Sequence, residues 1–91
     1  MINEERLEKI SGIGEYWGDK MPMMAMEECG ELIQAISKCE RAGLSNFVAT
    51  RNNLIEEMGD VIISIYALGD RYSITPEDIC DYIDSKINKK Y

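Results

Sequence analysis

The feature that most constrains this chain is an eight-residue segment that occurs twice. Met26–Ile33 reads MEECGELI, and Ile55–Ile62 reads IEEMGDVI. Each copy has two adjacent acids, then a third acid three residues after the second. Because residues three apart lie on the same side of a helix, each copy places a pair of carboxylates on one side of a helix. Two such helices face to face would gather four carboxylates, here called the inner acids: Glu28, Glu31, Glu57 and Asp60.

A rotation of about 100° per residue separates these acids from their neighbours. Glu28 and Glu57 fall within the apolar arcs of their helices, and the other two inner acids fall at the margins. Glu27 and Glu56 point toward water. The repeat therefore predicts that the four inner acids face the core or lie at its margin, whereas Glu27 and Glu56 face solvent. The alternative is that all of them are ordinary acids on solvated helices.

A cation is needed to compensate carboxylates that face a core, because burying an unpaired charge is costly. Lys38 and Arg51 are the nearest basic residues in the sequence, and both fall on other helix faces. The chain has no histidine. This argues against zinc sites and against a di-metal redox bundle of the Glu-x-x-His kind. Carboxylate oxygens alone favour Mg²⁺, with Mn²⁺ as the second choice.

Length and charge restrict the remaining possibilities. Ninety-one residues predict a single domain over 1–91, small enough that association with other copies is expected. A net charge of −7 argues against binding to a nucleic-acid duplex. The absence of a long apolar run or a secretory leader predicts no membrane association and a cytoplasmic location. Three cysteines without metal-ligand spacing indicate free thiols in a reducing compartment.

The pattern predicts an all-α fold of four helices, since no segment alternates for long with the period of a strand. Asn3 is a candidate N-cap for the first helix, which Gly12, Gly14 and Gly18 should weaken or break. The other expected helices run from about 19–22 to 42, from a cap at 45 or 46 to 70 or 71, and from Thr75 onward. The second and third should lie antiparallel and form a bundle that another copy completes.

Glu28-x-x-Glu31 followed by Glu57-x-x-Asp60 resembles the signature of the MazG-like all-α nucleoside triphosphate pyrophosphohydrolases. The relatives of that group include the dimeric dUTPases and the phosphoribosyl-ATP pyrophosphohydrolases. The flanking strings MEECGELIQAISK and NLIEEMGDVIISIYAL are similar to the second and third helices of the group. The resemblance covers roughly residues 15–90, which is nearly all of the chain.

This resemblance implies Mg²⁺-dependent hydrolysis of a nucleoside triphosphate between the α and β phosphates, giving a monophosphate and pyrophosphate. The four inner acids would be the catalytic metal ligands. Bound Mg²⁺ neutralises phosphate charge and activates a water, and an inner acid could accept the proton of that water. The base, the sugar and the number of metal ions stay open.

Further residues have roles that the resemblance suggests. The C-terminal helix of the family supplies basic residues to the phosphates, and Lys86, with Lys89 or Lys90 behind it, matches that place. Alternatively, these lysines complement the helix dipole and remain solvated. Trp17 could stack on a nucleobase or serve as a core or interface anchor. The family often has Gln where this chain has Met23, so its base preference does not transfer.

A second functional class stays open. The chain could be a non-catalytic helical interaction or regulatory module that keeps the fold without turnover. Mid-helix Gly30 and Gly59 are compatible with close approach of another helix or a ligand, or with simple tolerance. A homo-oligomer, either dimer or tetramer, is expected in both cases.

Overall fold

The computed structural model describes residues 2–90, apart from the side chains of Ser45 and Lys90. Every regular element in this range is helical, which confirms the predicted all-α fold. The elements are α1 (Glu4–Trp17), η1 (Gly18–Lys20), α2 (Met21–Ala42), η2 (Gly43–Asn46), α3 (Phe47–Arg71) and α4 (Pro76–Lys90). The two η elements are short 3₁₀ turns that connect neighbouring helices.

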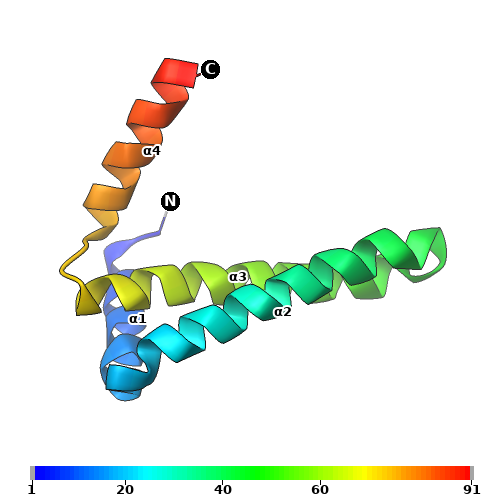
Figure 1. The fold of residues 1–91 in the computed structure, drawn as a ribbon, viewed down its shortest axis with the longest axis horizontal. Helices are drawn as coiled ribbons and strands as arrows, with labels where there is room; N and C mark the ends of the chain where they lie inside the picture. The colour runs from blue at the N-terminus through cyan, green and yellow to red at the C-terminus, as the bar shows by residue number, and fades with distance from the viewer. Residues whose placement is uncertain (1, 91) are drawn as a thin grey trace.

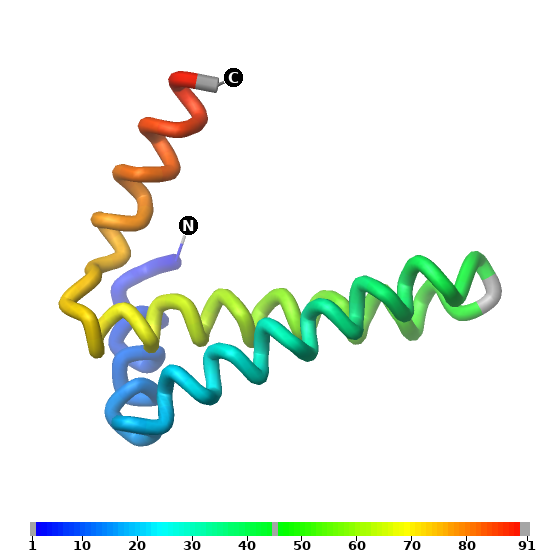
Figure 2. Tube along the Cα trace, in the orientation of Figure 1, coloured from blue at the N-terminus to red at the C-terminus, as the bar shows by residue number. Residues whose placement is uncertain are grey.

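The long helices α2 and α3 form an antiparallel hairpin, as the sequence predicts. They lie side by side along most of their length and account for the most extensive packing in the chain (Figures 1 and 2). The helix α1 crosses α3 at the base of the hairpin, and η2 closes the opposite end. The end that contains η2 is called the tip below. This arrangement places the two acidic octets on facing helices.

The first helix differs from its prediction. The Asn3 side chain accepts a hydrogen bond from the Arg6 backbone N–H, so the predicted N-cap is confirmed. The expected interruption by Gly12 or Gly14 does not occur, and α1 continues to Trp17. Only Gly18 ends it, with φ of 50°, a left-handed conformation that glycine adopts without steric cost. Two helical glycines are tolerated because α1 packs against α3.

At the turn between α2 and α3, the predicted end of α2 is confirmed, whereas the predicted Asn46 cap of α3 does not form. Gly43 has φ of 63° and ends α2 directly after Ala42. Asn46 occupies the position before α3, but its side chain makes no capping hydrogen bond. The alternative cap at Ser45 lies outside the described side chains. The 3₁₀ turn η2 therefore leads into α3 without the predicted side-chain cap.

The core lies at the base of the hairpin, where α1 meets α2 and α3. Its buried members are Ile10, Met21, Ala25 and Ala67, and Trp17 packs against them. Gly14 lets α1 approach α3 closely, because a Cβ at this position would lie 2.9 Å from the Ala67 carbonyl oxygen. This small core fixes the part of the hairpin next to the acidic octets.

A tight turn sets the direction of α4. The Ile74 and Tyr72 backbone N–H groups both donate to the Gly69 carbonyl, at 2.9 and 3.0 Å. The predicted start of α4 is confirmed: the Thr75 hydroxyl accepts from the Asp78 N–H, and the Asp78 carboxylate accepts from the Thr75 N–H. From this turn α4 rises away from the hairpin and makes almost no contact with the other helices (Figure 1). One chain alone therefore does not form a packed four-helix bundle.

Within the described range, none of the helices is both long enough and apolar enough to cross a membrane.

Candidate metal centre

The hairpin brings three of the four inner acids together. Glu28 and Glu31 come from α2, and Glu57 comes from α3. One carboxylate oxygen of each lies within 4.8 Å of one oxygen of both others. On α2, Glu28 and Glu31 follow the buried core residue Ala25 by three and six residues. On α3, Glu57 precedes Ile63, which packs against the core, by six residues.

Burial distinguishes the members of this cluster. Glu28 and Glu57 are half-buried, whereas Glu31 is exposed at the edge. One carboxylate oxygen of Glu28 and one of Glu57 are fully buried and have no hydrogen-bond partner among the described residues. The predicted inward orientation of these two side chains therefore agrees with the structure. Glu27 and Glu56 are exposed, as the helical rotation indicates.

The electrostatic environment of these carboxylates disfavours their charged forms. Burial raises the pKa of Glu28, and the neighbouring carboxylates of Glu31 and Asp60 raise it further. Burial also raises the pKa of Glu57, to which nearby Glu31 and Asp60 add. Like charges held close together and partly removed from water have this effect. A bound cation would reverse it.

The donor set fits a divalent oxygen-seeking cation. Buried carboxylate oxygens without partners are rare, because leaving them unsatisfied costs free energy. The ion pairs among the described residues are Lys9 with Glu5 and Arg71 with Asp19, and both lie away from the cluster. Three carboxylates within ligand reach and two orphaned oxygens are what a Mg²⁺ or Mn²⁺ ion would satisfy.

Asp60 lies near this cluster but not within the group of three. Its side chain is exposed, and its charge raises the pKa values of both Glu28 and Glu57. It also lines a pocket together with Glu28. Asp60 therefore lies close enough to influence the protonation of Glu28 and Glu57 by its charge. It stands at the side of the cluster that opens toward this pocket.

The pocket beside Asp60 contains Trp17. Its volume is about 150 Å³, and it lies between the end of α1 and the base of the hairpin. Trp17 is half-buried, packs against the core and forms part of the pocket wall. The two roles considered for Trp17, core anchor and ligand contact, are therefore compatible. Its ring meets the Tyr16 ring edge-on, with centroids 5.4 Å apart.

Sequence reasoning missed other members of the pocket wall. Met21, Met24 and Ile63 supply apolar surface, and Ser64 is the one polar side chain found buried in the described part of the chain. A signal for Ser64 was available, because it follows Glu57 by seven residues and Asp60 by four, and so shares their helix face. Met23, which replaces the usual Gln of the family, is exposed and does not line this pocket.

The lysines of α4 are not brought to the carboxylates within one chain. Lys86 and Lys89 are exposed on the helix that rises away from the hairpin. The side chain of Lys90 lies outside the described part of the chain. Gly30 and Gly59 likewise have nothing close to them within the chain, since a Cβ at either position would meet no atom within 4 Å.

Comparisons with known proteins show the family of this chain. The model of a family described as MazG nucleotide pyrophosphohydrolase domain matches residues 19–91. A Bacillus subtilis (strain 168) protein, the uncharacterized protein YvdC, is 36% identical over 72 residues, covering 72% of this chain and 68% of its own. No solved structure gives a significant match. The matched range contains all four inner acids.

Proposed function

Because this chain belongs to the MazG nucleotide pyrophosphohydrolase family, we propose that it hydrolyses nucleoside triphosphates between the α and β phosphates. The products are a nucleoside monophosphate and pyrophosphate, and the reaction depends on Mg²⁺, for which Mn²⁺ can substitute. The proposed location is the cytoplasm, where reducing conditions suit three free cysteines.

One observation carries this proposal: the buried, unpartnered oxygens of Glu28 and Glu57, which lie on facing helices beside Glu31. Such a cluster destabilises a folded chain unless a cation joins it. A nucleoside triphosphate in the cell is itself a chelator of Mg²⁺. An ion held by these carboxylates would therefore also attract the phosphates of a nucleotide.

The residues of the chain have distinct proposed roles. Glu28, Glu31 and Glu57 hold the cation, and Asp60 completes the ligand set or accepts a proton from the attacking water. When bound, Mg²⁺ neutralises phosphate charge and makes a water more acidic. Glu27 and Glu56 face solvent and take no part. No side-chain nucleophile is needed for this reaction.

The pocket beside Asp60 is the proposed place for the base. Trp17 offers a π surface for stacking, and Met21 and Met24 offer adaptable apolar contacts. Ser64 provides one hydroxyl for hydrogen bonding. The pocket shares Glu28 and Asp60 with the carboxylate cluster, so a nucleotide could reach from one to the other.

The test is a panel of ribo- and deoxyribonucleoside triphosphates, incubated with the full chain and either Mg²⁺, Mn²⁺ or EDTA. Pyrophosphate and monophosphate are both measured. We expect equal amounts of the two products with at least one nucleotide and none in EDTA. Absence of pyrophosphate with every nucleotide and both metals would remove the proposal.

The non-catalytic module remains the competing function. It offers no reason for two buried carboxylate oxygens without partners, since a helical interaction module could carry glutamine or leucine at these positions. If the module were correct, Glu57→Gln should leave its biological activity intact. No observation in the structure favours it over hydrolysis.

A further inference from the structure

A basic pocket lies on the hairpin between the carboxylate cluster and the tip. Its volume is about 280 Å³, and its wall is formed by Lys38, Arg41 and Ala42 at the end of α2, by Asn46 of η2 and by Thr50 of α3. We call it the tip pocket. Two of its five lining residues carry a positive charge. Such a wall suits an anion, and phosphate in particular.

Helical spacing aligns the tip pocket with the carboxylates. Lys38 follows Glu31 by seven residues on α2, and Thr50 precedes Glu57 by seven residues on α3. Seven residues make about two helical turns, so each pair lies on one side of its helix and about 10.5 Å apart along the axis. Lys38 is rotated about 80° from the core-facing Glu28 but only about 20° from Glu31. Because α2 and α3 are antiparallel, both steps lead toward the tip (Figure 1).

The same spacing leads in the opposite direction to the pocket beside Asp60. Met24 precedes Glu31 by seven residues, and Ser64 follows Glu57 by seven residues. Both Met24 and Ser64 line that pocket. One face of the hairpin therefore carries, in order, the pocket proposed for the base, the carboxylate cluster and the tip pocket. A nucleotide has its base, its α phosphate and its outer phosphates in the same order.

The tip pocket is a basic part of an acidic protein. The chain has 17 acids and 10 basic residues, whereas the segment 38–51 has three basic residues and one acid, Glu40. Helical rotation places Glu40 about 200° from Lys38, and Glu40 does not line the pocket. Neither Lys38 nor Arg41 forms an ion pair with a carboxylate of the described residues. Their charges are therefore available to an anion.

Hydrogen-bond donors are available in the tip pocket as well. The Arg41 Nε donates to the Ser37 carbonyl at 3.3 Å. This contact leaves the terminal nitrogens of the guanidinium for a phosphate. The Asn46 side chain makes no capping hydrogen bond to α3, so its amide can also donate. The Thr50 hydroxyl, by contrast, already donates to the Asn46 and Phe47 carbonyls, at 3.0 and 3.2 Å.

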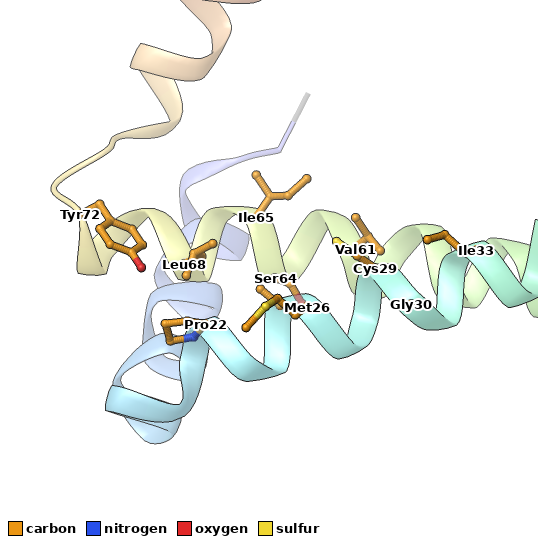
Figure 3. A pocket seen from close by; sticks show the side chains of 11 residues that line it. Pro22, Met26, Cys29, Gly30, Ile33, Val61, Ser64, Ile65, Leu68 and Tyr72 are labelled. Atoms are coloured by element: carbon orange, nitrogen blue, oxygen red, sulfur yellow. The ribbon is translucent and has the colours of Figure 1, made fainter.

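Two other places on the chain suit the phosphates less well. A larger groove of about 590 Å³ lies on the hairpin, where Met26, Ile33 and Ile65 line it, but no residue of its wall carries a charge (Figure 3). On α4, Lys86 and Lys89 carry the right charge, but the helix rises away from the hairpin. Of these three places, only the tip pocket combines positive charge with alignment on the carboxylates.

We infer that Lys38 and Arg41 bind the outer phosphates of the nucleotide and thereby select triphosphates over diphosphates. This assignment rests on the proposed hydrolysis, because the nucleotide has to lie across the carboxylate cluster for its outer phosphates to reach the tip pocket. The four-carbon stem of Lys38 lets its charge approach the cluster from the tip side. A diphosphate is one phosphate shorter and makes this contact less completely. Pyrophosphate would then leave from the tip side of the site.

The first experiment measures binding of inorganic tripolyphosphate to the full chain in Mg²⁺ by isothermal titration calorimetry. This probe has no base and requires no turnover. The tip variant, Lys38→Gln with Arg41→Gln, should bind at least about tenfold more weakly than the wild type, because charge-assisted hydrogen bonds are lost. The charge-preserving variant, Lys38→Arg with Arg41→Lys, should retain binding. The matched control, Lys9→Gln with Lys20→Gln, removes two exposed charges elsewhere and should bind as the wild type does.

Two results of this titration would overturn the inference. One is the absence of measurable tripolyphosphate binding by the wild type. The other is equal affinity of the tip variant and the wild type. Circular dichroism checks that every variant is as helical as the wild type.

The second experiment compares the triphosphate and the diphosphate of the best nucleoside, the latter as a substrate or as a competitive inhibitor. For the tip variant, kcat/KM of the triphosphate should fall at least about tenfold, whereas the diphosphate should be affected much less. An equal loss for both would indicate a merely structural role and overturn the inference. A loss in Lys86→Gln with Lys89→Gln but not in the tip variant would assign the phosphates to α4 and overturn it too.

The two experiments separate failure of this assignment from failure of the proposed function. If pyrophosphate is released and the tip variant behaves as the wild type, only the assignment of Lys38 and Arg41 is wrong. If no nucleotide is hydrolysed but tripolyphosphate binding depends on these two residues, the tip pocket is a polyphosphate site and the proposed hydrolysis is wrong.

Discussion

Glu28 on α2 faces Glu57 on α3 across the hairpin, and each keeps one buried carboxylate oxygen without a hydrogen-bond partner. With Glu31 at their edge, their ligand atoms lie within 4.8 Å of one another. Burial, together with the neighbouring carboxylates of Glu31 and Asp60, raises the pKa of both residues. A cation relieves both effects at once, so stability and metal binding should be coupled in this protein.

Mg²⁺ or Mn²⁺ should raise the melting temperature of the protein. A ligand that binds only the folded state stabilises it by about 2.7 kcal/mol at one hundred times its Kd. For a domain of this size, each kcal/mol corresponds to roughly 4–8 °C. Differential scanning fluorimetry with increasing metal checks this. Glu57→Gln should abolish the shift, and the matched solvent-facing variant Glu56→Gln should retain it; equal shifts in both variants would contradict the site.

Without metal, stability should fall as pH rises above about 4.5, the ordinary pKa of a glutamate. The pKa values of Glu28 and Glu57 are raised in the folded state, so the folded chain holds protons that the unfolded chain has already released. Stability therefore decreases with pH until the raised values are passed. Asp78 has a lowered pKa and acts in the opposite sense, at lower pH.

Urea unfolding in EDTA, repeated across this pH window, measures the effect. Combining Glu28→Gln with Glu57→Gln should flatten the profile, because the titrating groups are then gone. Glu56→Gln is the matched control and should keep the wild-type slope, because Glu56 is exposed and does not contribute to either raised pKa. A metal-free wild type whose stability increased through this window would show that the two pKa values are not raised.

Gly14 and Gly12 provide a paired test of the α1–α3 contact. A Cβ at position 14 would lie 2.9 Å from the Ala67 carbonyl oxygen, whereas a Cβ at position 12 would meet nothing within 4 Å. Gly14→Ala should therefore destabilise the protein by about 1–3 kcal/mol. Gly12→Ala should stabilise it by up to about 1 kcal/mol, because alanine favours the helix. Chemical denaturation of the two variants measures both changes, and equal effects would contradict this packing.

Trp17 should affect substrate affinity more than its neighbour does. Stacking of a base on an aromatic ring contributes about 1–3 kcal/mol, so Trp17→Leu should raise KM about tenfold or more. Tyr16→Leu changes an exposed ring that does not line the pocket and should leave KM nearly unchanged. Steady-state pyrophosphate release at increasing nucleotide concentration measures the difference. A change in kcat without a change in KM would argue against a base contact.

The sequence contains enough local information to predict the hairpin. The inward direction of Glu28 and Glu57 follows from helical rotation, because each lies among apolar residues of its own helix. Several helix ends also follow from local chemistry, such as the left-handed Gly43 and the reciprocal bonds of Thr75 and Asp78. These features depend on neighbours in the sequence, which is why they can be inferred without a structure.

Other features depend on contacts that the sequence does not record. The interruption expected in α1 fails because packing of Gly14 against Ala67 favours a continuous helix. The direction of α4 depends on the turn at Gly69, and it carries Lys86 away from the carboxylates that it was expected to serve. Asp60 faces a pocket that only the meeting of α1 with the hairpin creates.

The proposed hydrolysis is tested most directly by the products that the wild type, Glu57→Gln and Glu56→Gln form from the best nucleotide in Mg²⁺. Phosphorus NMR identifies and quantifies these products. We predict monophosphate and pyrophosphate in equal amounts from the wild type and Glu56→Gln, and a loss of at least about a hundredfold in rate for Glu57→Gln. Nucleoside diphosphate and inorganic phosphate as products, or full activity of Glu57→Gln, would contradict the proposed reaction and its metal site.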